Sequence, residues 1–410
     1  MPIPWRDAMS HALYGPDGFF VAGGGPADHF RTSVHASPAF ATALLRLLSQ
    51  VDAALGHPPR LDVVDVGAGR GELLHSLLRL VAAAPAVGVA VGVSGEPTHS
   101  GRSGLIPAWA GSPETPTSTA SVRRSPDGPS SGTVRRSLAE RVRFTAVEYA
   151  HRPENLPEEI NWTAEIPDEI NGLLIATEWL DNVPLDVAVH TTEGWRYVLV
   201  DPDSGVETVG ELVNAADVDW LTTWWPSPAS PSSATGDPDL GLTWSDATSP
   251  ETPHSDYQRA EIGRSRDEAW ANAVRQISRG LAVAVDYGHL REGRPVDGTL
   301  TGYRGGRQVP PVPDGSSDVT AHVAMDSVAS AGAAVARCAY SLISQAEALR
   351  ALGADGGRPP LSLAGTDPAG YVRALAAASA VAELTDPAGL GGHLWLHQPV
   401  GIGLPPAVAR

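Results

Sequence analysis

The sequence contains a short apolar run that leads directly into three closely spaced glycines. Residues 61–66 read Leu-Asp-Val-Val-Asp-Val, and residues 67–72 read Gly-Ala-Gly-Arg-Gly-Glu. Leucine and valine then recur with helical spacing over residues 73–81. This order predicts a buried strand, a tight turn and a helix. Such a unit is typical of parallel α/β sheets, in which the turn and the helix N-terminus direct backbone N–H groups toward a polar ligand.

The spacing of the glycines discriminates between cofactors. The dinucleotide fingerprint G-x-G-x-x-G needs a third glycine at position 72, where this chain has Glu72, so NAD and FAD are disfavoured. The pattern instead resembles motif I of class I methyltransferases, which bind S-adenosylmethionine (SAM). That resemblance implies a SAM site formed by Asp65, Gly67, Gly69 and Gly71. A plain strand-to-helix turn is the structural alternative.

The composition excludes several classes of protein. All 29 Lys+Arg residues are arginine, so the chain has no Walker lysine, kinase lysine or Schiff-base lysine. A net charge of −18 would repel the phosphate backbone of a nucleic acid. The single cysteine, Cys338, allows no internal disulfide and no cysteine-rich metal site, and we expect no bound metal.

The same features predict a soluble, cytoplasmic protein. Residues 1–7 lack the basic and apolar regions of a signal peptide, and no run of about eighteen apolar residues follows. A lone cysteine fits a reducing compartment. We therefore expect no membrane insertion, and the sequence leaves the oligomeric state open.

Two polar segments, at 92–137 and 226–256, interrupt the chain. Both are rich in Ser, Thr and Pro, and we expect them to be flexible insertions. The predicted organisation consists of a helical N-terminal segment over the cofactor site at 1–56 and one SAM-binding domain at 57–410, with cap elements around 190–280 and 300–330.

The position of the second strand decides which acid could hold the ribose of the cofactor. Residues 87–93 are apolar but contain glycine, and their nearest acid is Glu96. Residues 142–147 end directly in Glu148, so we favour this second segment. A carboxylate at that place can accept hydrogen bonds from both ribose hydroxyls. The structural alternative for Glu148 is a solvated acid at a strand end.

Further apolar runs predict the rest of the fold. They suggest strands at 172–177, 281–285, 335–340 and 392–397, with helices such as 267–277 between them. Alternating strands and helices predict an α/β, Rossmann-like class I methyltransferase fold with a doubly wound, mostly parallel sheet. The last two strands, one of them containing Cys338, are expected to form a terminal antiparallel hairpin.

Several segments, in order, resemble the MidA-like family of SAM-dependent methyltransferases, whose mitochondrial members help to assemble respiratory complex I. The segments are 9–20 (Met-Ser-His-Ala-Leu-Tyr-Gly-Pro-Asp-Gly-Phe-Phe), 28–33 (Asp-His-Phe-Arg-Thr-Ser), 177–184 (Thr-Glu-Trp-Leu-Asp-Asn-Val-Pro), 286–288 (Asp-Tyr-Gly), 298–304 and 318–323. The chain departs from the family pattern at 305–307, where a histidine is usual, and at 324–325. The resemblance implies an arginine side chain of a protein as the methyl acceptor, for instance in a respiratory complex subunit.

An arginine acceptor needs carboxylates that can pair with its planar guanidinium. Glu178 and Asp181 are the candidates, because a spacing of three puts both on one face if the chain turns helical after Thr177. Helix capping is the alternative for Asp181. His322 is a third candidate, as a base or an orienting group, with a structural role as its alternative. The alternative functions are a small-molecule methyltransferase and a non-catalytic assembly module.

Overall fold

The computed structural model describes residues 1–22, 32–83, 136–225, 258–354 and 356–408. The expected insertions at 92–137 and 226–256 fall almost entirely outside these residues. The same holds for the competing strand at 87–93 and for residues 28–31 of one motif. Among the described helices, none combines the length and hydropathy that crossing a membrane requires.

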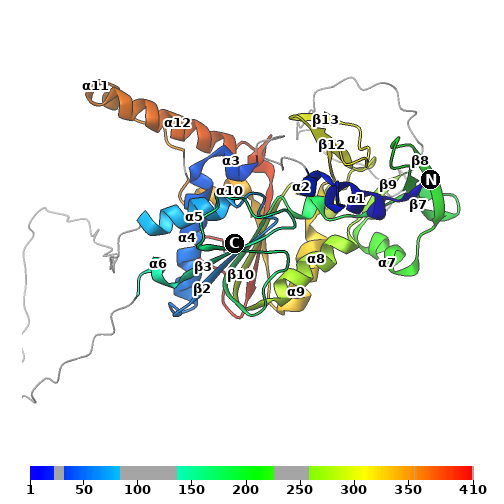
Figure 1. Cartoon of the computed structure of the whole chain (residues 1–410), viewed down its shortest axis with the longest axis horizontal. Coiled ribbons are helices and arrows are strands. Elements are labelled where there is room, and N and C mark those ends of the chain that lie inside the picture. Colours follow the sequence, from blue (N-terminus) through cyan, green and yellow to red (C-terminus); the bar gives the residue numbers. More distant parts are fainter. Residues whose placement is uncertain (23–31, 84–135, 226–257, 355, 409–410) are drawn as a thin grey trace, which may run out of the picture.

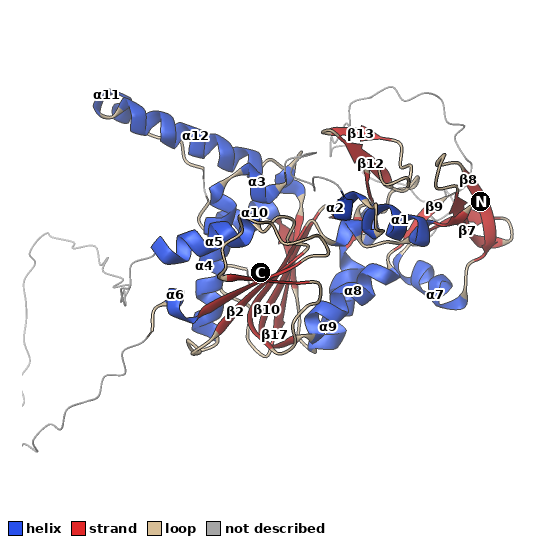
Figure 2. Ribbon diagram, in the orientation of Figure 1, coloured by secondary structure: helices blue, strands red, loops and turns tan. Residues whose placement is uncertain are grey.

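A seven-stranded sheet forms the larger part of the molecule (Figures 1 and 2). Its strands stand in the order β16-β17-β10-β5-β2-β3-β4. In that order they span Ser341–Ser344, Leu394–Val400, Ile277–Asp286, Ile170–Thr177, Leu61–Val66, Val142–Val147 and Ile160–Thr163. The five strands from β10 to β4 are parallel to one another, and β17 runs antiparallel to both β10 and β16. This confirms the predicted mostly parallel α/β sheet.

Helices cover both faces of this sheet. Because side chains alternate along a strand, Val63 of β2 belongs to one hydrophobic cluster and Val64 to another. The first cluster includes residues of α4 (Pro38–Ala54), α5 (Glu72–Ala83) and α10 (Gln345–Ala351). The second includes residues of α8 (Arg264–Arg275) and α9 (Met325–Ala336). The sheet is therefore doubly wound, as predicted.

The strand predicted around Cys338 is wrong. Helix α9 occupies the first part of that segment and ends at Arg337, which takes a left-handed conformation with φ of 52°. Cys338 is half-buried in the turn that follows, and the strand β16 begins only at Ser341. The end of α9 is rich in alanine and valine, so its composition resembles that of a buried strand over a short window. The antiparallel pairing of the last two strands is nevertheless confirmed, between β16 and β17.

A smaller group of sheets lies beside the main sheet, at the right of Figure 1, and we refer to it as the cap. Its largest sheet joins β1, β7, β6, β9 and β8, and a three-stranded sheet joins β13, β12 and β14. The strands are β1 (Ile3–Pro4), β6 (Asp186–Thr191), β7 (Gly194–Val200), β8 (Glu207–Leu212), β9 (Arg259–Ile262), β12 (Thr301–Arg304), β13 (Arg307–Val309) and β14 (Asp318–Thr320), and a separate short pair joins β11 (Gly288–His289) to β15 (Val323–Ala324).

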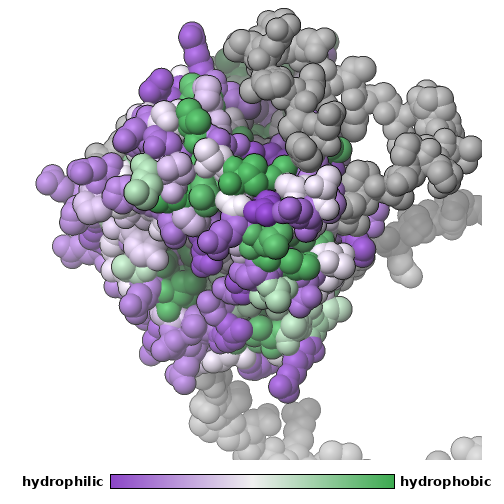
Figure 3. Space-filling view, turned by 90° about the vertical axis from the view of Figure 1, so that its right-hand side faces the viewer, coloured by the Kyte–Doolittle hydropathy of each residue, from purple (hydrophilic) through white to green (hydrophobic). Residues whose placement is uncertain are grey.

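The start of the chain is built into this cap. β1 pairs with β7, and α1 (Trp5–Tyr14) buries Trp5, Met9 and Leu13 against residues of β6 and β7. A second cluster joins the cap strands to α7 (Ala215–Trp224) and to Trp225. Figure 3 views this end of the molecule, where hydrophobic residues lie in separate patches between hydrophilic ones.

The remaining helices connect these parts or project from them. Short helices α2 (Phe19–Ala22) and α3 (Ser33–Ala36) lie between α1 and α4, and α6 (Leu138–Arg141) precedes β3. Helices α11 (Leu361–Thr366) and α12 (Pro368–Leu384) form an arm that extends from the main body at the upper left of Figure 1. Only Val381 and Leu384 of α12 are buried.

Candidate functional site

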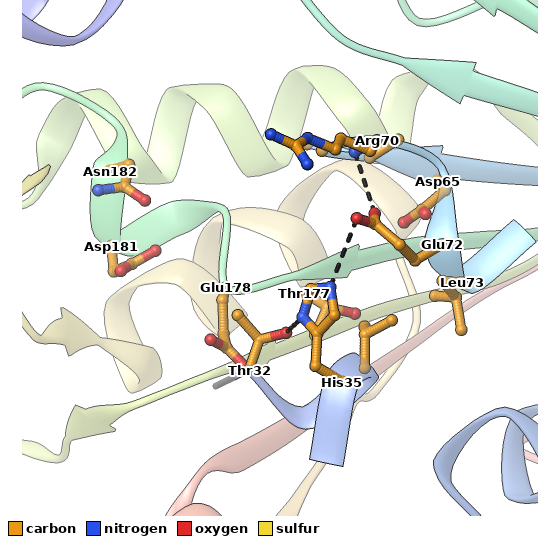
Figure 4. A pocket seen from close by; sticks show the side chains of 14 residues that line it. Thr32, His35, Asp65, Arg70, Glu72, Leu73, Thr177, Glu178, Asp181 and Asn182 are labelled. Atoms are coloured by element: carbon orange, nitrogen blue, oxygen red, sulfur yellow. Dashed lines mark hydrogen bonds and ion pairs between the residues drawn. The ribbon is translucent and has the colours of Figure 1, made fainter. Parts of the chain in front are cut away.

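A pocket opens at the carboxyl ends of β2 and β5, the edge of a parallel sheet where ligands bind (Figure 4). Four parts of the chain line it: the start of α3, the end of β2, the glycine turn with the start of α5, and residues 177–182 after β5. The hollow is open to solvent on one side.

The glycine turn has a backbone that only glycine adopts readily. Gly67, Gly69 and Gly71 have φ of 72°, 58° and 81°, all in the left-handed region. A Cβ at Gly67 would lie 3.0 Å from the ring of Trp179, and one at Gly71 would lie 2.7 Å from Leu156. Gly67 and Gly69 line the pocket, whereas Gly71 lies outside its lining. Two of the glycines therefore shape the pocket wall, and the third allows close packing behind it.

Glu148 is held against this turn from the neighbouring strand. β3 pairs in parallel with β2, which confirms the choice of residues 142–147 as the second strand. The backbone N–H of Gly69 donates to Oε2 of Glu148 at 3.0 Å, and the N–H of Tyr149 donates to Oε1 at 2.7 Å. Burial raises the pKa of Glu148, and these hydrogen bonds lower it in part. Glu148 contacts the turn but is not among the residues that line the pocket.

Asp65 ends β2 inside the pocket and is 3% exposed. Burial, followed by the charges of Glu72 and Glu148, raises the pKa of Asp65 to about 8. The carboxylate of Glu72 lies between Arg70 and His35 in Figure 4: it accepts the N–H of Arg70 at 3.0 Å, and Nε2 of His35 is 3.4 Å away.

His35 and Thr32 were not among the sequence candidates. They belong to α3 and its N-cap, and Nδ1 of His35 is 2.7 Å from the hydroxyl of Thr32. The pair with Glu72 raises the pKa of His35. A helix of four residues leaves no periodic pattern in the sequence. The available signal was the motif at 28–33, which contains Thr32 and ends two residues before His35.

Glu178 directly follows β5 and lines the pocket. It has φ of 51°, a left-handed conformation that is uncommon for a residue with a Cβ and is often found at functional sites. Its Oε1 accepts the backbone N–H of Ser33 at 2.9 Å. Burial raises the pKa of Glu178 to about 7, in spite of that hydrogen bond.

Asp181 lines the same pocket and is 3% exposed. The turn that carries it is a three-residue 3-10 helix, Leu180–Asn182, whose N-cap is Trp179, so the capping alternative for Asp181 does not hold. Its Oδ2 accepts the hydroxyl of Thr320 at 2.8 Å and also that of Tyr287. Its Oδ1 is buried and has no hydrogen-bond partner within the described residues.

His322 lies apart from the two carboxylates. It follows β14, its side chain is exposed, and it is not among the residues that line the pocket. Its ring centroid is 5.1 Å from that of Tyr287, and its backbone N–H donates to Thr299. The structure thus places Glu178 and Asp181 in the lining of one pocket. His322 lies outside this lining, in contact with the ring of Tyr287.

A buried polar network supports the turn that carries Asp181. Oδ2 of Asp286, at the end of β10, accepts the backbone N–H groups of Leu180 and Asp181 at 3.0 and 3.2 Å. Arg266 of α8 is 1% exposed. It donates to the backbone carbonyls of Asp181, Val183, Ala321 and His322. The sequence offered Asp286 only as part of a motif and gave no sign of Arg266.

The chemistry of the lining suits a small, positively charged ligand. Two residues of the lining, Thr177 and Asp181, each carry a buried oxygen, Oγ1 and Oδ1, that has no hydrogen-bond partner in the part of the chain that the structure describes. The lining also contains four acidic side chains, Asp65, Glu72, Glu178 and Asp181. The pKa values of Asp65 and Glu178 are raised to about 8 and about 7, and a nearby positive charge would favour their ionised forms. The sulfonium and ammonium groups of SAM are complementary to such a wall. No group of three or more His, Cys, Asp or Glu that could hold a metal occurs within the described residues.

Comparisons with known proteins agree with this geometry. Residues 129–342 match the model of a family described as "Putative S-adenosyl-L-methionine-dependent methyltransferase". The fold is similar to the crystal structure of a COG1565 superfamily member from Burkholderia thailandensis bound to S-adenosyl-homocysteine, with a TM-score of 0.65 and 21% identity over 100% of this chain and 91% of that one. A native crystal structure of a COG1565 superfamily protein from the same organism gives a TM-score of 0.63, 21% identity and coverage of 100% and 90%. No curated protein matches the sequence.

Proposed function

The chain belongs to the S-adenosyl-L-methionine-dependent methyltransferase family whose model matches about half of it, and from this premise we propose that the pocket beyond β2 and β5 holds SAM beside a nitrogen acceptor. The observation that carries the proposal is the meeting of the glycine turn with two buried carboxylates in one hollow. The turn suits the cofactor, and the carboxylates suit a cationic acceptor.

For the cofactor, we assign the backbone of Gly67 and Gly69 to the close approach of SAM, and Gly71 to the packing that fixes the turn. Their left-handed backbone supports this assignment. Glu148 would accept the ribose hydroxyls, since it already lies against Gly69. Asp65 would face the positive end of the methionine moiety. Bound SAM supplies an electrophilic methyl group, which passes from sulfur to the acceptor in an in-line displacement.

For the acceptor, we assign Glu178 and Asp181 to binding the guanidinium of a protein arginine side chain. Their carboxylates can pair with N–H groups and orient one nitrogen toward the methyl group. As the N–CH3 bond forms, that nitrogen must release a proton. Glu178, with a pKa of about 7, is suited to receive it. We assign His322 an orienting role on the acceptor side, which it would exert through its ring contact with Tyr287.

The first test is calorimetric titration of the purified protein with SAM and with S-adenosylhomocysteine. We expect both to bind, and no binding of either would overturn the cofactor assignment. The second test incubates the protein with SAM labelled in its methyl group and a protein extract, followed by amino-acid analysis of the labelled product. Labelled methylarginine supports the proposal. Label confined to small molecules would assign a small-molecule acceptor instead.

A further inference from the structure

The two oxygens of the Asp181 carboxylate have different surroundings. Oδ2 accepts hydrogen bonds from the hydroxyls of Thr320 and Tyr287, while Oδ1 is buried and has no partner within the described residues. Asp181 itself is one of the residues that line the pocket. An unpaired buried acceptor destabilises the folded protein, because it has lost its hydrogen bonds to water. Such a cost is tolerated where a ligand supplies the missing donor.

The two hydroxyls come from parts of the chain far from Asp181. Tyr287 follows β10, and Thr320 ends β14 in the cap. The two hydroxyl oxygens lie 2.6 Å from each other. Each hydroxyl carries one proton, and when both protons go to Asp181 the two donors meet at Oδ2. Both donors therefore reach the same oxygen, and the carboxylate cannot rotate without breaking two hydrogen bonds.

We propose that Tyr287 and Thr320 are positioning residues, which hold one oxygen of Asp181 and leave the other aimed at an N–H group of the methyl acceptor. This inference rests on the proposed function, because it assigns an atom to the acceptor side of the same pocket. The inference also gives the cap a role in the site, because Thr320 of a cap strand donates a hydrogen bond to Asp181 in the turn after β5.

The backbone of Asp181 is fixed as firmly as its side chain. Asp286 accepts its N–H, and Arg266 donates to its carbonyl. With both backbone groups and one side-chain oxygen bound, Oδ1 is the atom of Asp181 that is left for a ligand. A donor placed there gains a charge-assisted hydrogen bond in a buried site.

A carbon-13 NMR titration of protein labelled at the aspartate carboxyl carbons tests this directly. The signal of Asp181 is identified as the one missing from the Asp181→Asn variant. Hydrogen bonds from Tyr287 and Thr320 lower the pKa of Asp181 against the effect of burial. We therefore expect its midpoint to rise in Tyr287→Phe and in Thr320→Val, with SAM affinity within about twofold of wild type. The other ionisable groups that act on Asp181 are present in every variant. They include Arg266, Glu178, Asp286, Asp318, Tyr14, Tyr303 and His322.

The Tyr340→Phe variant, outside the site, serves as the control and should leave the midpoint unchanged. An unchanged midpoint in a folded Tyr287→Phe or Thr320→Val variant would overturn the inference. Having two variants keeps the test decisive if one of them fails to fold. Failure of wild type to bind SAM would overturn the proposed function instead, so the two failures are distinguishable.

Discussion

The backbone N–H of Ser33 donates a hydrogen bond to the carboxylate of Glu178, with 2.9 Å between the two atoms. Ser33 opens the four-residue helix α3, and Glu178 follows the central strand β5. The segment that matches the methyltransferase family begins at residue 129. A residue outside that segment therefore holds one of the two carboxylates proposed to bind the acceptor.

Removing this N–H should impair methyl transfer. Proline is tolerated at the first position of a helix, so Ser33→Pro deletes the donor with little cost to α3. We expect transfer to fall about tenfold, the equivalent of one hydrogen bond, with SAM affinity retained. Assays with labelled SAM would measure this. Ser33→Ala keeps the N–H and is the matched control, and an equal loss in both variants would contradict the role given to the backbone.

A side chain at Gly69 should abolish SAM binding. Valine would occupy the surface that we assign to the cofactor, at a backbone φ of 58° that disfavours β-branched residues. Gly56→Ala separates strain from obstruction, because Gly56 has φ of 77°, open space around it and no contact with the pocket. Calorimetry should show no SAM binding for Gly69→Val and wild-type affinity for Gly56→Ala. Equal SAM affinities in wild type, Gly69→Val and Gly56→Ala would show that the glycine turn does not bind the cofactor.

Glu148→Ala should weaken SAM binding by about tenfold or more, since two ribose hydroxyls lose a common acceptor. Glu148→Gln retains one acceptor oxygen and should give an intermediate affinity. The exposed Glu154 lies nearby in sequence, and Glu154→Ala is the control. Wild-type affinity in Glu148→Ala would mean that Glu148 does not bind the ribose. The alternative interpretation, an acid at a strand end without a role in binding, would then hold.

The protein without cofactor should lose stability as the pH rises. The folded state keeps protons on Asp65 up to about pH 8 and on Glu178 up to about pH 7. The unfolded chain releases them near pH 4 to 4.5. Folding therefore takes up protons between these limits, and the free energy of unfolding falls across that window.

Calorimetric scans at about pH 6 and about pH 8.5 would show this as a lower Tm at the higher pH. Glu178→Gln should reduce the difference because glutamine does not titrate. Glu154→Gln, at an exposed position, should leave it as it is. A Tm that rises over this pH range in wild type would show that ionisable groups other than Asp65 and Glu178 determine how stability depends on pH.

Arg266→Leu should cost about 3 kcal/mol of unfolding free energy, because it leaves several buried carbonyls without a donor. Arg275 lies on the same helix with its side chain exposed, and Arg275→Leu should cost less than about 0.5 kcal/mol. Urea denaturation of both variants measures the difference. Similar costs for the two would mean that the carbonyls find other partners.

The features that could be predicted from the sequence are those that arise from residues close together in the chain. The strand, glycine turn and helix at 61–83 follow from local pattern, and Glu148 was identified because it directly ends an apolar strand. The segment at Cys338 failed because a short apolar stretch reads alike as strand or helix end. The role of Arg266, and the contact that Tyr287 makes with Asp181, could not be predicted for a different reason. Their hydrogen bonds to the turn of Asp181 join residues 85 and 106 positions apart, which no local pattern encodes.

The place of β17 in the main sheet has a consequence for how the protein is made. β17 pairs on one side with β10 and on the other with β16, although both precede it in the chain. During synthesis the apolar edge of β10 therefore stays open until the ribosome has released residue 400. Unpaired strand edges are sites at which incomplete chains can associate. A nascent chain of this protein is thus expected to complete its sheet, and to cover this edge, only after translation of β17.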